Sequence, residues 1–231
     1  MNDEEGRWIA EVVRETFARA ERPWPPGPDG PVPLNDLIGA SSLVHEEVAG
    51  LNHAVVSAML GRWRVRFTDV PEPDPPLAGF LYANARTGFI FVRRGDSLPR
   101  RRFTVAHELG HYCLHLAPAL TQSDLPAGEL VQSDAEIRES GEANLAAMER
   151  QANRFAAELL MPEATCRALF DRARSRYGTT QRFLVHQLSG ELLVSPEAME
   201  WRLYGLGLVG KPRRKGRGRG LEEAPKTSEV G

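Results

Sequence analysis

The stretch His107-Glu108-Leu109-Gly110-His111 decides both the fold and the chemistry that we predict for this chain. It lies in a predicted helix over residues 99–116, whose apolar residues recur at steps of four, three and four. These are Val105, Leu109, Tyr112 and Leu116. Residues four apart share one face of a helix, so the two imidazoles can converge on one metal ion. Glu108 projects beside that ion, where its carboxylate can take a proton from water.

A catalytic zinc ion needs a third protein ligand and an open position for water. His115 continues the face of His107 and His111, but it lies a further turn away, about 6 Å along the axis. Glu149, on the next predicted helix, is therefore the better candidate. Asn153 follows four residues later on the same face, where it could hydrogen-bond and orient a ligating histidine. The alternative third ligands are Glu142 and Glu158.

The residues before the HExxH helix predict a small sheet. Residues 63–67 alternate apolar and charged side chains, which is typical of a half-buried strand. Two further strands are expected over residues 79–82 and 89–92, and residues 84–88 between them have the composition of a hairpin turn. Asp96 or Ser97 can cap the helix that follows, and Pro118 lies where that helix is expected to have ended.

The rest of the chain is predicted to be helices joined by loops. Helices are expected over residues 7–20, about 35–60 and 142–160, and three short helices over 163–209. Prolines rule out regular structure over 23–33, and residues 118–141 are expected to form a polar loop. We therefore divide the chain into an accessory segment (1–33), a core (34–162), a helix-turn-helix-like helical segment (163–209) and a disordered tail (210–231).

Composition narrows the classes of protein that the sequence can represent. The chain has 231 residues, a formal net charge of -2 and two cysteines, so neither a disulfide framework nor a strong overall basic field is expected. No apolar stretch approaches the length of a signal peptide core or a membrane span. We therefore expect a cytoplasmic protein with no membrane partner.

Two segments together resemble the ImmA/IrrE family of metallo-endopeptidases. Residues 102–115 (RFTVAHELGHYCLH) resemble the family's active-site helix, and residues 149–162 (ERQANRFAAELLMP) resemble its second signature. Residues 193–203 (LVSPEAMEWRL) are similar to a helical segment that follows the catalytic core. The resemblance covers roughly residues 51–209; the long 118–141 loop departs from the family, and residues 1–50 have no recognised counterpart in it.

The resemblance implies an α+β fold with a minimal zincin-like core, in which a small sheet supports the active-site helix and a Glu-bearing helix, followed by a helical C-terminal segment. It implies Zn²⁺ held by His107, His111 and Glu149, with Glu108 as general base. It also implies a protein substrate, because known family members cleave helix-turn-helix repressors and so derepress stress or mobile-element genes.

Peptide hydrolysis would also need a donor for the oxyanion and a surface for the substrate. The candidate donors are Tyr82, Tyr112, His115 and Arg102. The predicted strand over 89–92 could pair with an extended substrate by β-addition.

Two alternative functions come from other classes. The helices near 163–209 could form a helix-turn-helix-like unit, which would make the protein a DNA-binding regulator with a structural metal site. Residues 100–102 and 211–219 are rich in Arg and Lys and could contact phosphates. Against specific nucleic-acid binding, the last predicted helix carries one basic residue, Arg202, and recognition helices usually present several polar and basic groups. The second alternative is an antirepressor that sequesters its partner without cutting it.

Overall fold

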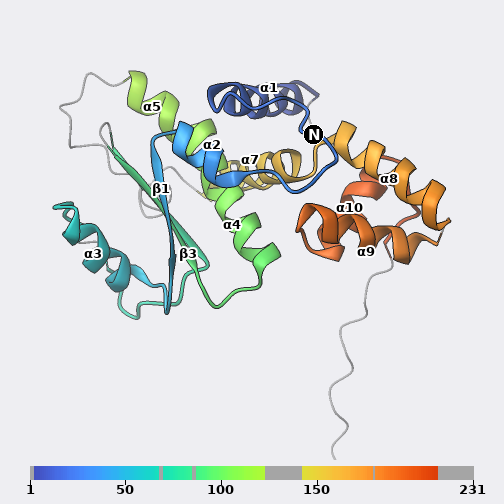
Figure 1. Cartoon of the computed structure of the whole chain (residues 1–231). Coiled ribbons are helices and arrows are strands. Elements are labelled where there is room, and N and C mark those ends of the chain that lie inside the picture. The colour runs from blue at the N-terminus through green and yellow to red at the C-terminus, as the bar shows by residue number, and fades with distance from the viewer. Residues whose placement is uncertain (1–2, 68–69, 85–86, 123–141, 179, 213–231) are drawn as a thin grey trace, which may run out of the picture.

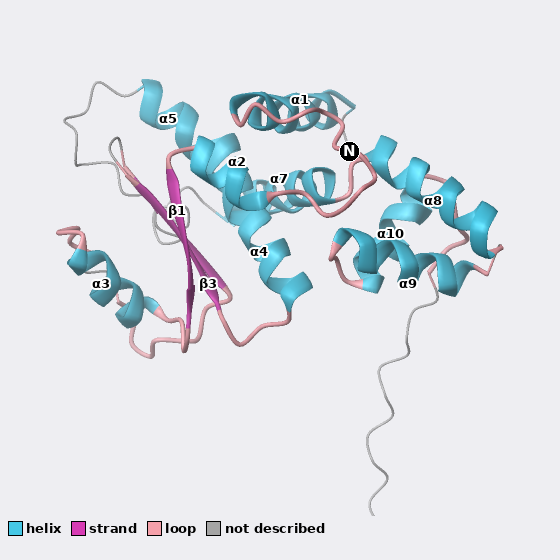
Figure 2. Cartoon of the chain, in the orientation of Figure 1, coloured by secondary structure: helices cyan, strands magenta, loops and turns pink. Residues whose placement is uncertain are grey.

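The computed structural model describes residues 3–67, 70–84, 87–122, 142–178 and 180–212, and its fold is α+β, as predicted (Figures 1 and 2). The strands are β1 (Leu43–Val48), β2 (Gly79–Ala83) and β3 (Gly88–Arg93). The helices are α1 (Asp3–Arg19), α2 (Leu34–Ala40), α3 (His53–Arg62), α4 (Leu98–His111), α5 (Ala117–Gln122), α7 (Glu142–Leu160), α8 (Glu163–Tyr177), α9 (Gln181–Leu192) and α10 (Pro196–Gly205).

The three strands form one mixed sheet in the order β1-β3-β2. β2 and β3 pair antiparallel, as predicted, and their turn is held by two hydrogen bonds between Asn84 and Thr87. β1 pairs with β3 in parallel. The central strand β3 is therefore paired along both edges, and β2 forms one edge of the sheet.

Alternate residues of the sheet face two different apolar layers. Phe80, Phe89 and Phe91 pack with α3 in one cluster of buried side chains. Leu81 and Ile90 point the other way, into the larger cluster that includes α4 and α7. Figure 1 shows the sheet between α3 on one side and α4 on the other. Because strand side chains alternate between faces, the sheet separates these two layers, and one of its faces packs against α4.

α4 and α7 pack closely because a glycine lies where they meet. A Cβ atom added at Gly110 would lie 3.0 Å from Phe155 Cδ1 and 3.2 Å from the Cα atom of Ala152. The side chain that Gly110 lacks thus lets the backbone of α7 approach α4. This contact brings the polar faces of the two helices, with their histidines and carboxylates, to the same place.

Two predictions for the region before the hairpin are wrong. The helix expected over 35–60 is interrupted by β1, where polar residues 45–47 obscure the alternation that would indicate a strand. The strand expected over 63–67 is absent: Trp63 caps the C-terminus of α3, and Arg64 adopts a φ of 60°, which no strand residue can have. β1 is recognisable only through its pairing with β3, a contact between distant residues.

The HExxH helix is longer than predicted. α4 passes at Tyr112 into a π-helical turn (Tyr112–Leu116), and the chain remains helical through α5 to Gln122. Pro118 therefore does not follow the end of the helix but lies within the helical stretch, two residues after the π-helical turn ends. The loop prediction is wrong for residues 118–122, and the rest of that loop lies outside the described residues.

The N-terminal and C-terminal helices share the larger apolar cluster. Ile9, Val13 and Phe17 of α1 are buried in it, and so are side chains from α8, α9 and α10. The three helices predicted over 163–209 are present, and Ser195 caps α10 by accepting a hydrogen bond from Ala198 N–H at 3.1 Å. The predicted tail is described only as far as Pro212. Among the described helices, none is long and apolar enough to cross a membrane.

Candidate metal centre

Three potential metal ligands converge between α4 and α7. The Nε2 atoms of His107 and His111 lie 3.1 Å apart. Glu149 of α7 reaches both rings, with Oε2 3.4 Å from His107 Nε2 and Oε1 3.2 Å from His111 Nε2. The three residues form a group that could hold a metal ion.

The spacing of these donor atoms fits a tetrahedral zinc ion. Ligands about 2.0–2.1 Å from zinc, at tetrahedral angles, lie about 3.3 Å from one another. The two ring nitrogens lie 3.1 Å apart, and each of them lies at a similar distance, 3.4 or 3.2 Å, from a different oxygen of the Glu149 carboxylate. Two imidazoles and one carboxylate are also the ligand set of catalytic zinc sites that keep a fourth position open. The residues therefore fit a metal ion of this kind.

Asn153 orients the first histidine of the group. Its Oδ1 lies 3.2 Å from the Nδ1 atom of His107. An amide oxygen only accepts hydrogen bonds, so Nδ1 must carry the proton and Nε2 must present its lone pair. The Nε2 atom that faces His111 and Glu149 is thus prepared to bind a cation.

The carboxylate of Glu149 is held in its charged form. Interactions with the neighbouring His107 and His111 rings lower the pKa of Glu149 far below its usual range, and they outweigh the opposing effect of burial. Its side chain is nonetheless 45% exposed. An ionised, partly exposed carboxylate beside two imidazoles is available as a ligand without first losing a proton.

Glu108 lies against the sheet on the wall of the same cleft. Its side chain is buried, and a Cβ atom added at Gly79 would lie 2.5 Å from Glu108 Oε1 and 2.4 Å from Thr104 Cγ2. Gly79 opens β2, so the start of this strand runs directly beside the carboxylate. A side chain at position 79 would therefore have to displace the Glu108 carboxylate and the Thr104 methyl group.

The cleft that contains these groups has a volume of about 490 Å³. Its walls come from the start of β2 with the residues before it, from one face of α4, and from α7. The lining residues are Pro76, Leu77, Ala78, Gly79, Arg100, Phe103, Thr104, His107, Glu108, His111, Leu145, Glu149 and Asn153.

The four candidate oxyanion donors do not line this cleft. Tyr82 lies on the opposite face of the sheet, where its hydroxyl accepts a hydrogen bond from Asn84. Arg102 donates instead to the carbonyl of Val32 at 2.8 Å, and the half-buried Tyr112 packs against the larger apolar cluster. Its partial burial raises the pKa of the Tyr112 hydroxyl.

His115 lies beside the group rather than in it. Its ring centroid is 5.5 Å from that of His111. Burial lowers the pKa of His115 to about 4, and the neighbouring His111 ring contributes to this lowering. A neutral ring next to His111 is consistent with a supporting position.

The structure also places the alternative ligands and the expected substrate strand. Glu158 pairs with Arg202 at 2.6 Å and does not join the metal group. The side chain of Glu142 lies outside the described residues. The strand over 89–92 cannot accept another strand because β3 is already paired on both edges. β1 and β2 form the two edges of the sheet instead, and β2 is the one that begins at the cleft, which residues 76–79 line.

Gly79 and Thr104 line the cleft without having been singled out from the sequence, and Arg100 lines it although the sequence indicated it only as part of a basic run. Arg100 and Thr104 precede Glu108 by eight and four residues, so helical spacing could have placed both on its face. Gly79 carries no such signal, because its role depends on how closely β2 passes α4.

Comparison with known proteins agrees with this geometry. A search of curated proteins found no match. The family model for the IrrE N-terminal-like domain, a peptidase family, matches residues 63–204. The match covers more than half of the chain and includes the HExxH helix and the glutamate-bearing helix. The chain therefore belongs to the IrrE N-terminal-like peptidase family, and its function is of the metallopeptidase type.

Proposed function

We propose that the protein is a zinc-dependent endopeptidase in which His107, His111 and Glu149 hold the metal and Glu108 is the general base. The observation that carries this proposal is the convergence of two imidazoles and one carboxylate, a group that could hold a metal ion, on a cleft that also contains a buried glutamate. Membership of a peptidase family supports it independently.

A bound zinc ion would supply Lewis-acid chemistry, lowering the pKa of a water molecule and polarising the peptide carbonyl. Glu108 takes the proton of the attacking water and then returns it to the nitrogen of the leaving amine. The start of β2 at Gly79 lies directly beside the Glu108 carboxylate and limits how far it can move between the two transfers. Asn153 keeps His107 in the tautomer that can bind the metal.

The substrate is proposed to bind as an extended chain along β2. This strand is at the edge of the sheet, and the residues that precede it line the cleft beside Glu108. An extended peptide could therefore add to the sheet edge through main-chain hydrogen bonds, with its scissile bond near the metal group.

We further propose that the natural substrate is a helix-turn-helix transcriptional repressor, cleaved in the cytoplasm to derepress stress or mobile-element genes. Support for this step is the resemblance of residues 102–115 and 149–162 to family members with that activity. A short helix-turn-helix repressor encoded next to this chain would be the first substrate to test.

The decisive experiment combines metal analysis with cleavage. The purified chain should contain about one zinc ion per molecule and should cut the neighbouring repressor, and a chelator should stop the reaction until zinc is restored. Glu108→Gln should retain zinc and lose cleavage. Full cleavage by Glu108→Gln, or no zinc bound by the wild-type chain, would refute the proposal. Derepression that persists with Glu108→Gln would instead identify an antirepressor.

A further inference from the structure

Three consecutive arginines, Arg100, Arg101 and Arg102, occupy the first turns of α4, which has no acidic residue in its first turn. The N-terminus of a helix carries a partial positive charge that disfavours cations. Each guanidinium therefore needs a hydrogen-bond acceptor or a carboxylate beside it. The three arginines differ in the number of such partners.

Arg101 and Arg102 each have a hydrogen-bond partner elsewhere in the protein. Arg101 donates to the carbonyls of Arg94 and Asp96 at 3.1 and 2.8 Å and pairs with Glu47 at 3.0 Å. Arg102 donates to the Val32 carbonyl. Arg101 thus links α4 to β1, and Arg102 links α4 to the proline-rich segment over residues 23–33. Their role is structural.

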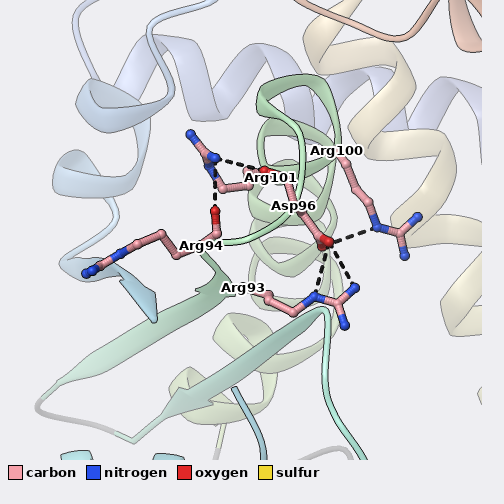
Figure 3. Close-up of polar contacts among 5 residues, drawn as sticks. All are labelled: Arg93, Arg94, Asp96, Arg100 and Arg101. Atoms are coloured by element: carbon pink, nitrogen blue, oxygen red, sulfur yellow. Dashed lines mark hydrogen bonds and ion pairs between the residues drawn. The ribbon is translucent and has the colours of Figure 1, made fainter. Parts of the chain in front are cut away.

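Arg100 differs from Arg101 and Arg102 because most of its side chain is exposed and it bonds one residue among those described. Its side chain is 61% exposed, and only its Nε atom bonds within the described residues, to Asp96 Oδ2 at 3.2 Å. Asp96 also pairs with Arg93 at 2.9 Å, so one carboxylate is shared by two guanidiniums (Figure 3). The Arg93, Asp96 and Arg100 cluster therefore keeps a net positive charge, and the two terminal nitrogens of Arg100 remain available.

Arg100 lines the same cleft as the candidate metal ligands. Among the described residues that line the cleft, Arg100 is the only lysine or arginine. It precedes His107 by seven residues on α4, which corresponds to about 10 Å along the axis. An extended peptide advances about 3.3 Å per residue, so about three residues span that distance.

From this geometry we propose that Arg100 selects substrates that carry an aspartate or glutamate about three residues from the cleaved bond. The inference rests on the proposed endopeptidase function and names a substrate class for it. Two terminal guanidinium nitrogens can bind a carboxylate in a bidentate manner. Asp96 holds the guanidinium from its Nε side and so fixes the direction of the other donors.

Peptide binding to the Glu108→Gln variant tests the inference without requiring hydrolysis. The probes are a fluorescent neutral peptide of Ala, Leu and Ser, blocked at both ends, and its single-glutamate versions at each position. Fluorescence anisotropy should show one position where glutamate tightens binding by about fivefold, as expected for a partly exposed ion pair. Blocked ends exclude any contribution from a terminal carboxylate.

Substitutions then assign the effect to Arg100. In the Glu108→Gln background, Arg100→Gln should abolish the preference for glutamate, and Arg100→Glu should replace it with a preference for lysine at the same position. Arg94→Gln is the matched control: Arg94 belongs to the same arginine-rich segment, but it points away from Arg100 and bonds the Glu47 carbonyl (Figure 3). It should keep the preference.

Equal binding of all peptides, or a glutamate preference that survives Arg100→Gln, would overturn the inference. Failure of the endopeptidase proposal looks different, because the wild-type chain would then bind acidic peptides through Arg100 and cut none of them. Thermal melting of each variant verifies that it is folded.

Discussion

Asn153 Oδ1 lies 3.2 Å from His107 Nδ1, so a residue of α7 fixes the tautomer of a histidine on α4. The same helix supplies Glu149, one turn earlier. α7 thus contributes both a potential ligand and the group that prepares another ligand, and the metal site depends on the packing of the two helices.

Asn153→Ala should weaken zinc binding or activity by about 10-fold to 100-fold, which is typical when the partner of a ligating histidine is removed. The cause is loss of the acceptor that keeps the His107 proton on Nδ1. Competition with a zinc-sensitive chelator dye measures the affinity. Asn153→Asp, which keeps an acceptor, should bind zinc more tightly than Asn153→Ala; equal affinities would contradict the tautomer argument.

Gly79→Ala should lower kcat while leaving zinc affinity near the wild-type value. The new methyl group would overlap Glu108 Oε1 and Thr104 Cγ2, so the carboxylate must move. A displacement of about 1 Å in a reacting group can cost about 100-fold in rate. Peptidase kinetics and zinc titration separate the two effects. Gly95→Ala, whose Cβ would have no neighbour within 4 Å, is the control that should retain activity.

Gly110→Ala should reduce both stability and zinc affinity, because the added methyl group separates α4 from α7. Overpacking of a buried contact costs about 1–3 kcal/mol. Urea unfolding gives the free energy, and the same zinc titration gives the affinity. Gly190→Ala, in the last turn of α9 with open space around its Cβ, should instead be neutral or slightly stabilising. Matching effects at the two sites would disprove the packing explanation.

Cys166 should make the protein less stable in alkali. Burial raises the pKa of its thiol from 9.0 to about 11. The folded state therefore retains a proton that the unfolded state loses, so this contribution is complete below pH 9 and is lost as the pH rises towards 11. Between pH 8 and 10, wild type should lose about 1 kcal/mol more unfolding free energy than Cys166→Ala. If urea unfolding gave the same pH dependence of the unfolding free energy for wild type and Cys166→Ala, the prediction would be wrong.

The sequence could predict those parts of the fold that depend on local patterns. His107 and His111 are four residues apart on a helix with one apolar face, so their rings could be placed together on another face. Glu149 and Asn153 are also four residues apart, which placed them together on α7. The β2–β3 hairpin and the three C-terminal helices also follow from local signals. The choice of Glu149 over His115 required only the rise of a helix.

Contacts between distant residues were not predictable in this way. β1 forms because β3 offers it a parallel partner, and its polar middle residues conceal it in the sequence. Tyr82 appeared as a possible donor because alternation alone does not say which face of a strand meets the active-site helix. Gly79 and Arg100 became visible only when the path of β2 and the charges around Asp96 were known.

The larger apolar cluster has a consequence for where the chain can be shortened. The family model begins at residue 63, but the side chains of Ile9, Val13 and Phe17 and the whole of β1 precede that point. A fragment trimmed to the matched residues would expose one edge of β3 and leave a cavity beneath α7. Such a fragment should aggregate when expressed, whereas a chain beginning at residue 3 should remain in solution and bind zinc.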